Sequence, residues 1–402
     1  MAMAGFALDD RQRLDWLRLI RSESIGPRTF RTLVNRFGGA AGALDALPEL
    51  GRQAGRTLRL CTIAEAEREF EALRRRGAHL IALGEAAYPV PLQAIDSAPP
   101  LIAIEGEPAV LSRPCVALVG SRNASAAGLK FTATLARELG EAGFVVVSGL
   151  ARGIDTSAHQ ASLESGTIAV LAGGLDQVYP PQNISLLDRI RPRGAALSEM
   201  PLGWVPRGRD FPRRNRLVSG LALGTVVVEA ARKSGSLITA RFANEQGRQV
   251  FAVPGSPLDP RAEGGNHLIR EGAILCAETA HVVDVLAPML RQGDLFGPVP
   301  FLAREGGEPP ARQEALWDEL DLPEVLPAPT LELESEFPRR QDVVADVPHR
   351  LLLDLIGSAP IAMDDLVRAS GRPAREVSRI LLELELEGVV QRHAGGALSR
   401  SG

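Results

Sequence analysis

Two loops in the middle of the chain combine glycine with arginine directly after a run rich in valine. The first follows residues 116–119, and the second follows residues 144–147. A buried strand that ends in glycine and leads into a helix exposes backbone N–H groups, which bind anions and phosphate above all. Arginine adds a forked donor that suits phosphate. We therefore expect a phosphate-tracking surface made by Gly120, Ser121 and Arg122 of the first loop and by Gly149, Arg152 and Gly153 of the second.

A strongly basic run lies between Arg189 and Arg216. It holds eight arginines against two acids, Glu199 and Asp210, which gives a local net charge of +6 in a chain of net charge −4. Inside it stands an aromatic ring flanked by arginines. Single-stranded DNA binds such a pattern, because the ring stacks a base and the guanidiniums bind phosphates. The alternative is a solvated loop whose phenylalanine packs inward. We favour DNA binding, through Phe211, Arg213, Arg214, Asn215 and Arg216.

A third candidate loop follows the predicted strand 225–228. Small residues there open a helix and would make another anion-binding N-terminus, although a serine N-cap alone is a simpler explanation. The loop consists of Lys233, Ser234, Gly235 and Ser236. Glu229 lies close to these cationic loops, so we expect it to pair with an arginine rather than to act in catalysis.

Asp155 and His159 stand four residues apart, on one face of the helix predicted after the second loop. Asp155 is expected to cap that helix through its first-turn N–H groups. In a hydrolytic enzyme the pair would be a base and the group that orients it. Because no nucleophile or cluster of metal ligands accompanies the pair, we favour a local hydrogen bond that fixes the loop.

The composition narrows the class of protein. A chain of 402 residues, 45% of them hydrophobic, is expected to hold two to four domains. Cys61, Cys115 and Cys276 are far apart, so we expect neither a zinc site nor a disulfide, in keeping with a reducing cytoplasm. We find no signal peptide pattern and no apolar run long enough to span a membrane. The dinucleotide pattern G-x-G-x-x-G and the ATP-binding pattern G-x-x-x-x-G-K-S/T are absent too, so we expect no cofactor and no metal.

Strands that alternate with helices from residue 101 onward would position the three loops. Such alternation predicts an α/β fold, with a parallel sheet covered on both faces and ligands at the carboxyl ends of its strands. The expected strands are 116–119, 144–147, 168–171, 195–197, 225–228 and 250–253, and the expected helices are 125–140, 156–165, 183–191 and 236–246.

The segments on either side of this core, which we place at 86–287, have other textures. Residues 1–85 predict a small helical domain, with a glycine–proline turn at 24–27 that could present N–H groups to DNA but more often serves packing. Residues 288–345 are rich in proline and acids, which predicts a mostly disordered linker with a helical turn near 314–320.

Residues 346–402 predict a winged helix-turn-helix, with helices at 350–356, 363–369 and 374–386 followed by a two-stranded wing. Its third helix carries Arg375 and Arg379 but also several glutamates. Like charge repels the phosphate backbone, so we favour protein contact or packing over reading of the major groove.

Taken in order, these motifs resemble the DNA-processing protein A family (DprA, also called Smf). The resemblance covers residues 101–286 and extends more loosely to the helical segment and the winged tail. It is carried by Gly120-Ser121-Arg122, Ser148-Gly149-Leu-Ala-Arg152-Gly153-Ile-Asp155 with His159, Gly174-Leu-Asp-Gln-Val-Tyr179-Pro180, Ser198-Glu199, Phe211-Pro-Arg-Arg-Asn215-Arg216, Ser234-Gly235-Ser236-Leu-Ile-Thr239-Ala240, Ala252-Val253-Pro254-Gly255 and Asn266-His-Leu268-Ile269-Arg-Glu-Gly272-Ala273.

The resemblance implies an extended Rossmann-like core between a small helical domain, of SAM or helix-hairpin type, and a winged helix. It implies a cytoplasmic protein without established catalytic activity that binds and protects single-stranded DNA during natural transformation and recombination. Such a protein would load the RecA recombinase onto that DNA, displace single-strand-binding protein, and form a homodimer.

By position, the resemblance assigns the phosphate groove to Gly120, Ser121, Arg122 and Arg152, and base stacking to Phe211 with Arg214 and Arg216 nearby. Similar proteins often carry a lysine just before that phenylalanine. Here Arg207, Gly208 and Arg209 precede it instead, so the sequence does not decide which cation takes the place of that lysine. Dimerisation is implied for the region 266–275, with Asn266, Leu268, Ile269 and Leu275 in the interface.

Two other classes compete with a single-strand binder. The same fold family includes phosphoribohydrolases that act on nucleoside monophosphates, but their signature P-G-G-x-G-T-x-x-E does not occur in this sequence. In the other, the winged tail reads duplex DNA and the core is secondary.

Overall fold

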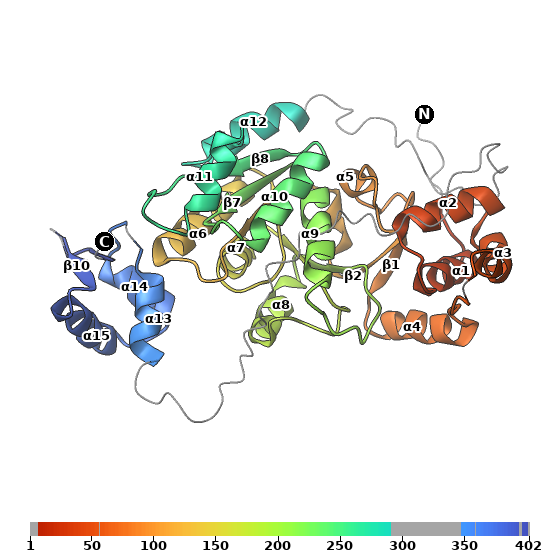
Figure 1. Cartoon of the computed structure of the whole chain (residues 1–402), viewed down its shortest axis with the longest axis horizontal. Coiled ribbons are helices and arrows are strands. Elements are labelled where there is room, and N and C mark those ends of the chain that lie inside the picture. The colour runs from red at the N-terminus through yellow and green to blue at the C-terminus, as the bar shows by residue number, and fades with distance from the viewer. Residues whose placement is uncertain (1–6, 56, 291–346, 358, 394–395, 401–402) are drawn as a thin grey trace.

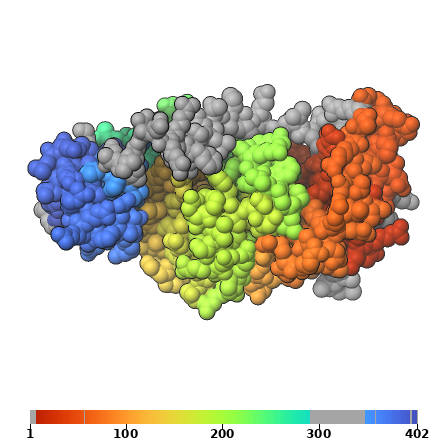
Figure 2. Space-filling model, turned by 90° about the horizontal axis from the view of Figure 1, so that it is seen from below, coloured from red at the N-terminus to blue at the C-terminus, as the bar shows by residue number. Residues whose placement is uncertain are grey.

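A computed structural model describes residues 7–55, 57–290, 347–357, 359–393 and 396–400. Four N-terminal helices, a central α/β core and a C-terminal winged helix lie in a row along the longest axis (Figure 1; Figure 2). The predicted linker lies outside the described residues from position 291 onward, including the helical turn near 314–320. Residues 288–290, placed in that linker from the sequence, instead end helix α12.

A mixed nine-stranded sheet forms the core, in the order β1-β2-β6-β5-β4-β3-β7-β8-β9. The six predicted strands are confirmed to within a residue at each end, and they pair in parallel. The predicted parallel sheet is confirmed over β6-β5-β4-β3-β7-β8-β9, and β1 and β2 extend it with an antiparallel edge that the sequence did not predict. The strands are β1 (His79–Ala82), β2 (Leu101–Gly106), β3 (Cys115–Gly120), β4 (Val145–Ser148), β5 (Thr167–Val170), β6 (Ala195–Ser198), β7 (Gly224–Val228), β8 (Gln249–Ala252) and β9 (Ile274–Leu275).

Helices cover both faces of the sheet, which explains why β4, β5, β6 and β7 are buried at every position and mostly apolar. Val116 and Leu118 of β3 pack with α6, α7 and α12, whereas Ala117 and Val119 face the side of α9 and α10. The core helices are α5 (Val90–Gln93), α6 (Ala126–Glu141), α7 (Ile154–Ala161), α8 (Ile184–Ile190), α9 (Asp210–Leu221), α10 (Gly235–Glu245), α11 (Glu263–Arg270) and α12 (Ala280–Leu290). Short 3₁₀ turns are η1 (Pro108–Ser112) and η2 (Pro181–Asn183).

Helix α9 was not predicted, because its first half is the arginine-rich segment that reads as a loop. The proline at its third position needs no hydrogen-bonded N–H in the first helical turn. Leu217, Val218 and Leu221 in its second half are buried against the sheet. The helix therefore fixes which arginines point inward and which point outward.

The N-terminal helices form a compact unit that continues into the core. Trp16 and Phe30 meet edge to face with ring centroids 4.9 Å apart, and the surrounding apolar cluster runs on into the sheet. Arg21 donates to the backbone oxygen of Glu199 at 3.0 Å. Strand β1 joins the core sheet although the sequence places residues 79–82 in the helical domain. The helices are α1 (Asp10–Arg21), α2 (Pro27–Phe37), α3 (Ala40–Gln53) and α4 (Ile63–Arg75).

The C-terminal segment forms the predicted three helices and wing, which pack on α6 of the core. Ala126 of α6 belongs to the winged domain's apolar cluster, and Lys130 pairs with Asp365 at 2.8 Å. Arg379 of its third helix pairs with Glu383 at 2.7 Å, so this arginine is already engaged within the helix. The elements are α13 (Val347–Leu355), α14 (Met363–Ser370), α15 (Ala374–Leu386), β10 (Val390–Arg392) and β11 (Leu398–Arg400).

Candidate nucleic-acid interface

The three predicted loops leave the sheet side by side. Strands β4, β3 and β7 are neighbours, and the order of the chain reverses between β3 and β7. Ligands of open α/β sheets bind at the carboxyl ends of the strands beside such a reversal. The first loop follows β3, the second follows β4, and the third follows β7.

Glycines allow the first two loops to touch. The N–H of Ile154 donates to the backbone oxygen of Ser121 at 3.2 Å. Gly153 has a φ of +72°, and a Cβ atom at this position would collide with that same oxygen. A Cβ atom on Gly120 would likewise collide with the backbone oxygen of Val228. These two glycines are therefore needed for close backbone approach, independently of any ligand.

An exposed cluster of arginine and aromatic side chains lies where these loops meet. The Arg122 guanidinium lies 5.4 Å from the ring centroid of Phe211. The ring of Tyr179 meets Phe211 edge to face, with centroids 5.4 Å apart. Together with Arg152 these side chains line a shallow hollow of about 10 Å³. We call this set, Arg122, Arg152, Tyr179 and Phe211, the aromatic–arginine site.

The structure thus brings together three residues that the sequence placed in one groove, Arg122, Arg152 and Phe211. Arg122 and Arg152 are exposed, and Phe211 is half-buried rather than sealed in the core. Sequence reasoning did not assign Tyr179 to the site. Tyr179 is 40% exposed. The signal that could have identified it is an aromatic residue in a loop bounded by glycine and proline, in a chain that is only 4% aromatic.

Arg214 does not reach this surface, contrary to expectation. It is 5% exposed and donates to the backbone oxygen of Val170 at 2.8 Å. The guanidinium lies directly beneath Gly149, where any side chain would collide with it. Burial lowers the pKa of Arg214 to about 10, although the nearby carboxylate of Asp155 opposes that shift. Arg214 supports the second loop from below and cannot contact a phosphate in this arrangement.

Arg216 is also buried, at 2% exposure, and is likewise a wrong assignment to the DNA surface. It pairs with Glu199 and donates to the backbone oxygen of Ser97 at 2.6 Å. Arg213 shares Glu199 at 3.0 Å but is about one-third exposed. Burial alone would raise the pKa of Glu199, but Arg216 and Arg213 outweigh it and lower that pKa. We call Arg214 and Arg216 the buried arginines.

Protein carboxylates occupy the N–H groups of two predicted anion sites. Glu229 accepts from the backbone N–H of Ser125 at 2.8 Å and from its hydroxyl, at the start of α6. Asp155 accepts from the N–H groups of Gly149 and Ala151, at 3.0 and 3.2 Å. Two expectations are therefore wrong among the described residues. Glu229 bonds to Ser125 rather than to an arginine, and Asp155 bonds to the second loop rather than capping α7. The side chains of Arg122 and Arg152 are the cations that these two loops leave exposed.

Asp155 and His159 form no hydrogen bond with each other in the described structure. His159 instead pairs through Nδ1 with the hydroxyl of Thr167 at 2.8 Å. Burial, helped by the positive charge of Arg214, lowers the pKa of His159 to about 3. Asp155 therefore holds the second loop through the loop's backbone N–H groups, whereas His159 is tied to β5 through Thr167.

The third loop is the open one. Lys233 and Gly235 are exposed, and a side chain at Gly235 would meet no atom within 4 Å. Ser234 caps α10 by accepting from the N–H of Ser236 at 3.3 Å. Asn215 donates to the backbone oxygen of Gly235 at 3.3 Å, which ties α9 to this loop.

The residues expected at a dimer interface lie at the far edge of the sheet. Asn266, Leu268 and Ile269 are on α11, and Leu275 is in the edge strand β9. Leu275 is 43% exposed. Asn266 exchanges two hydrogen bonds with the backbone of Gly255, at 3.2 and 2.9 Å.

Within the described ranges, no cluster of three or more His, Cys, Asp or Glu side chains could hold a metal ion. No helix in those ranges is long and apolar enough to cross a membrane.

Fold and site together define a protein with an open, Rossmann-like α/β core, helical and winged-helix flanks, and a cationic aromatic surface at the strand ends. The family of DNA recombination-mediator protein A matches residues 79–287, its N-terminal HHH domain matches residues 10–72, and its winged helix domain matches residues 336–396. The chain belongs to this family.

Named relatives agree with that assignment. Protein Smf of Escherichia coli is 37% identical over 321 residues, covering 79% of this chain and 76% of its own. DNA processing protein DprA of Streptococcus pneumoniae is 48% identical over 190 residues, covering 47% and 67%. The crystal structure of the S. pneumoniae protein superimposes with a TM-score of 0.53 at 38% identity, covering 61% of this chain and 82% of that one.

Proposed function

We propose that this chain binds single-stranded DNA at the aromatic–arginine site, with little preference for sequence. The proposal depends on one observation, the half-buried Phe211 ring with the Arg122 guanidinium 5.4 Å away and Arg152 and Tyr179 beside it. Unpaired bases stack on aromatic rings while arginines bind the flanking phosphates, and paired bases cannot reach such rings. The exposed Lys233 and the open start of α10 would bind a further phosphate.

Binding of the full chain to oligo-dT and to duplex DNA of equal length tests this proposal. We expect the single strand to bind more tightly at every salt concentration, and the double variant Arg122→Ala/Arg152→Ala to lose most of that affinity. Arg189→Ala is the matched control, since Arg189 is an exposed arginine on α8 that does not line the hollow at Phe211. Equal affinity of the double variant and the control would refute the site.

The proposed role is binding rather than catalysis, in the cytoplasm, where the three buried free thiols would stay reduced. Incubation with nucleoside monophosphates, with release of free base as the readout, tests the competing phosphoribohydrolase activity. We expect no free base to appear.

Membership of a recombination-mediator family supports a further part of the proposal, the loading of RecA onto single-stranded DNA coated with single-strand-binding protein. RecA's DNA-dependent ATPase activity on coated DNA measures this, and the chain should shorten its lag. The exposed edge at β9 supports a homodimer. Leu275→Glu should yield monomers in solution, whereas Leu258→Glu, at the more exposed Leu258 outside the predicted interface, should not.

A further inference from the structure

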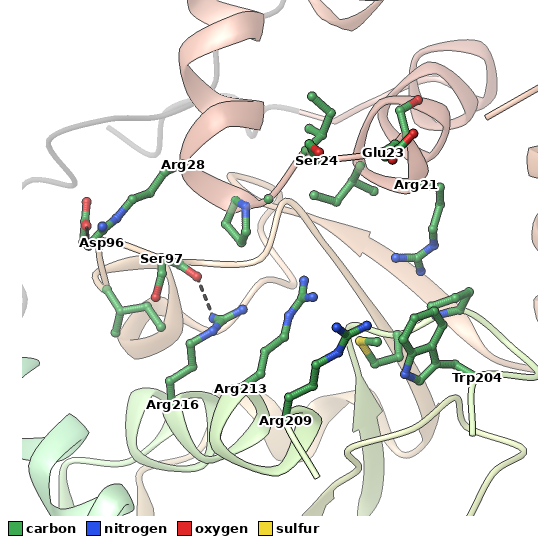
Figure 3. Close-up of a pocket in the computed structure, with 18 of the residues that line it drawn as sticks. Arg21, Glu23, Ser24, Arg28, Asp96, Ser97, Trp204, Arg209, Arg213 and Arg216 are labelled. Carbon is green, nitrogen blue, oxygen red and sulfur yellow. Dashed lines mark hydrogen bonds and ion pairs between the residues drawn. The ribbon is translucent and has the colours of Figure 1, made fainter. Parts of the chain in front are cut away.

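A large cleft separates the N-terminal helices from the core. Its volume is about 1040 Å³, far more than the hollow at Phe211. One wall is the turn at 24–27 between α1 and α2, and the other is the start of α9 with the preceding loop. Arg209 and Arg213 point from that start into the cleft (Figure 3). No residue of the aromatic–arginine site lines this cleft.

The cleft and the aromatic–arginine site share the first turn of α9. Arg209 and Arg213 lie two residues before and two residues after Phe211. Residues two apart on a helix point in nearly opposite directions, so Phe211 faces one side while the two arginines face the cleft. A helix with its side chains is about 10–12 Å wide. A flexible strand that leaves Phe211 therefore reaches the cleft by crossing a single helical turn.

The α9 wall carries surplus positive charge. Arg213 and Arg216 share one carboxylate, that of Glu199, and so this trio has a net charge of +1. Among the described residues, Arg209 makes no ion pair and is exposed. Acids on the cleft lining are mostly engaged by arginines, namely Glu65 by Arg59, Glu69 by Arg21, Asp96 by Arg28 and Glu245 by Arg241.

An aromatic ring stands beside these arginines. Trp204 lines the cleft and is only partly buried. Its indole N–H donates to Asp210 at 3.0 Å, and the Arg207 guanidinium lies 5.4 Å from its ring. The ring is thus held in place next to cations, which repeats the arrangement of Arg122 and Phe211.

We propose that the cleft is a second binding station for the same DNA strand, with phosphates at Arg209 and Arg213 and a base against Trp204. This inference rests on the proposed function, because the strand enters the cleft from the aromatic–arginine site. The two stations lie on opposite sides of the first turn of α9. A short oligonucleotide fills only the first station, and a longer one fills both.

Binding of the full chain to oligo-dT of about 6 and about 25 nucleotides tests the second station. Arg209→Glu should weaken binding of the long oligonucleotide about fivefold or more and leave the short one unchanged. Trp204→Leu should do the same, and Trp204→Phe should restore most of the long-oligonucleotide affinity because it keeps a ring. Arg189→Glu is the control of equal charge change. Arg209 is exposed, so the test survives even if Trp204→Leu unfolds.

Equal affinity of Arg209→Glu and Arg189→Glu for the long oligonucleotide would overturn the second station. So would an equal loss for both lengths, since it would place Arg209 in the first site. Photocrosslinking with 4-thiothymidine in the long oligonucleotide should modify the segment 204–209, and its confinement to Tyr179 and Phe211 would count against the cleft. Unchanged binding of both lengths by Phe211→Ala would instead refute the proposed function.

Discussion

The aromatic–arginine site and the buried arginines both depend on guanidinium groups, but the first group faces solvent and the second lies inside the fold. Arg122 and Arg152 are exposed beside Phe211 and Tyr179, whereas Arg214 and Arg216 are 5% and 2% exposed. The difference lies in their neighbours. Asp155 and Glu199 offer carboxylates beneath the surface, and a nearby carboxylate offsets part of the cost of burying an arginine. A segment rich in arginine therefore forms a basic surface only where its arginines are not paired with buried acids.

Removing a buried arginine gives the sharpest test of this comparison. Arg216→Met leaves Glu199 buried with only Arg213 to balance it. We expect the free energy of unfolding to fall by about 3–5 kcal/mol, because an uncompensated buried charge is costly. Urea denaturation measures this, with Arg122→Met as the control that should change stability by less than about 0.5 kcal/mol. Equal stability of the two variants would erase the distinction between the two groups.

Phe211→Ala should have the opposite profile, a large loss of binding with a smaller loss of stability. Stacking on an aromatic ring contributes about 1–3 kcal/mol per base, so the free energy of binding to oligo-dT should become less favourable by about that amount. Fluorescence anisotropy measures it, and Phe211→Trp should bind like the unmodified chain. A collapse of stability rather than of binding would move Phe211 into the group of structural residues.

The buried His159 predicts that the stability of the protein depends on pH. The pKa of His159 is about 3 in the folded protein, against about 6.5 when unfolded, so the unfolded state binds more protons between these values. Stability is therefore lost as the pH falls through 6.5, by about 2 kcal/mol between pH 7 and pH 5. Urea titrations at both pH values should show a smaller loss in His159→Asn. An identical loss in the variant would assign the pH dependence elsewhere.

Arg122→Ala should give the smallest effect, visible mainly in the salt dependence of binding. Each phosphate neutralised on a single strand contributes about 0.7 to the slope of log affinity against log salt. The variant should therefore have a slope shallower by about 0.7, while Arg189→Ala keeps the original slope. An unchanged slope would show that Arg122 does not contact a phosphate.

The sequence predicted the core strands well because buried parallel strands are short, valine-rich and bounded by glycine. It also predicted that Arg122 and Arg152 lie together, since the carboxyl ends of neighbouring parallel strands meet at one edge. Phe211 was added to them from the arginine-rich pattern around it and from the family resemblance. It failed at α9, where Arg213, Arg214 and Arg216 hide the helical period that buried leucines reveal only later. It failed also at β1 and β2, whose antiparallel pairing depends on partners distant in the chain.

Local sequence determined the glycine-opened loops, the family and the positions of the cations, because these depend on residue types and short spacings. Only the tertiary structure decided which N–H groups stay open and which arginines reach solvent. Glu229 and Asp155 approach the loops of β3 and β4 through folding, and they occupy donors that the sequence leaves for a phosphate. A charged side chain and its partner are often distant in the sequence, so only the folded structure determines which charges are buried and which are paired.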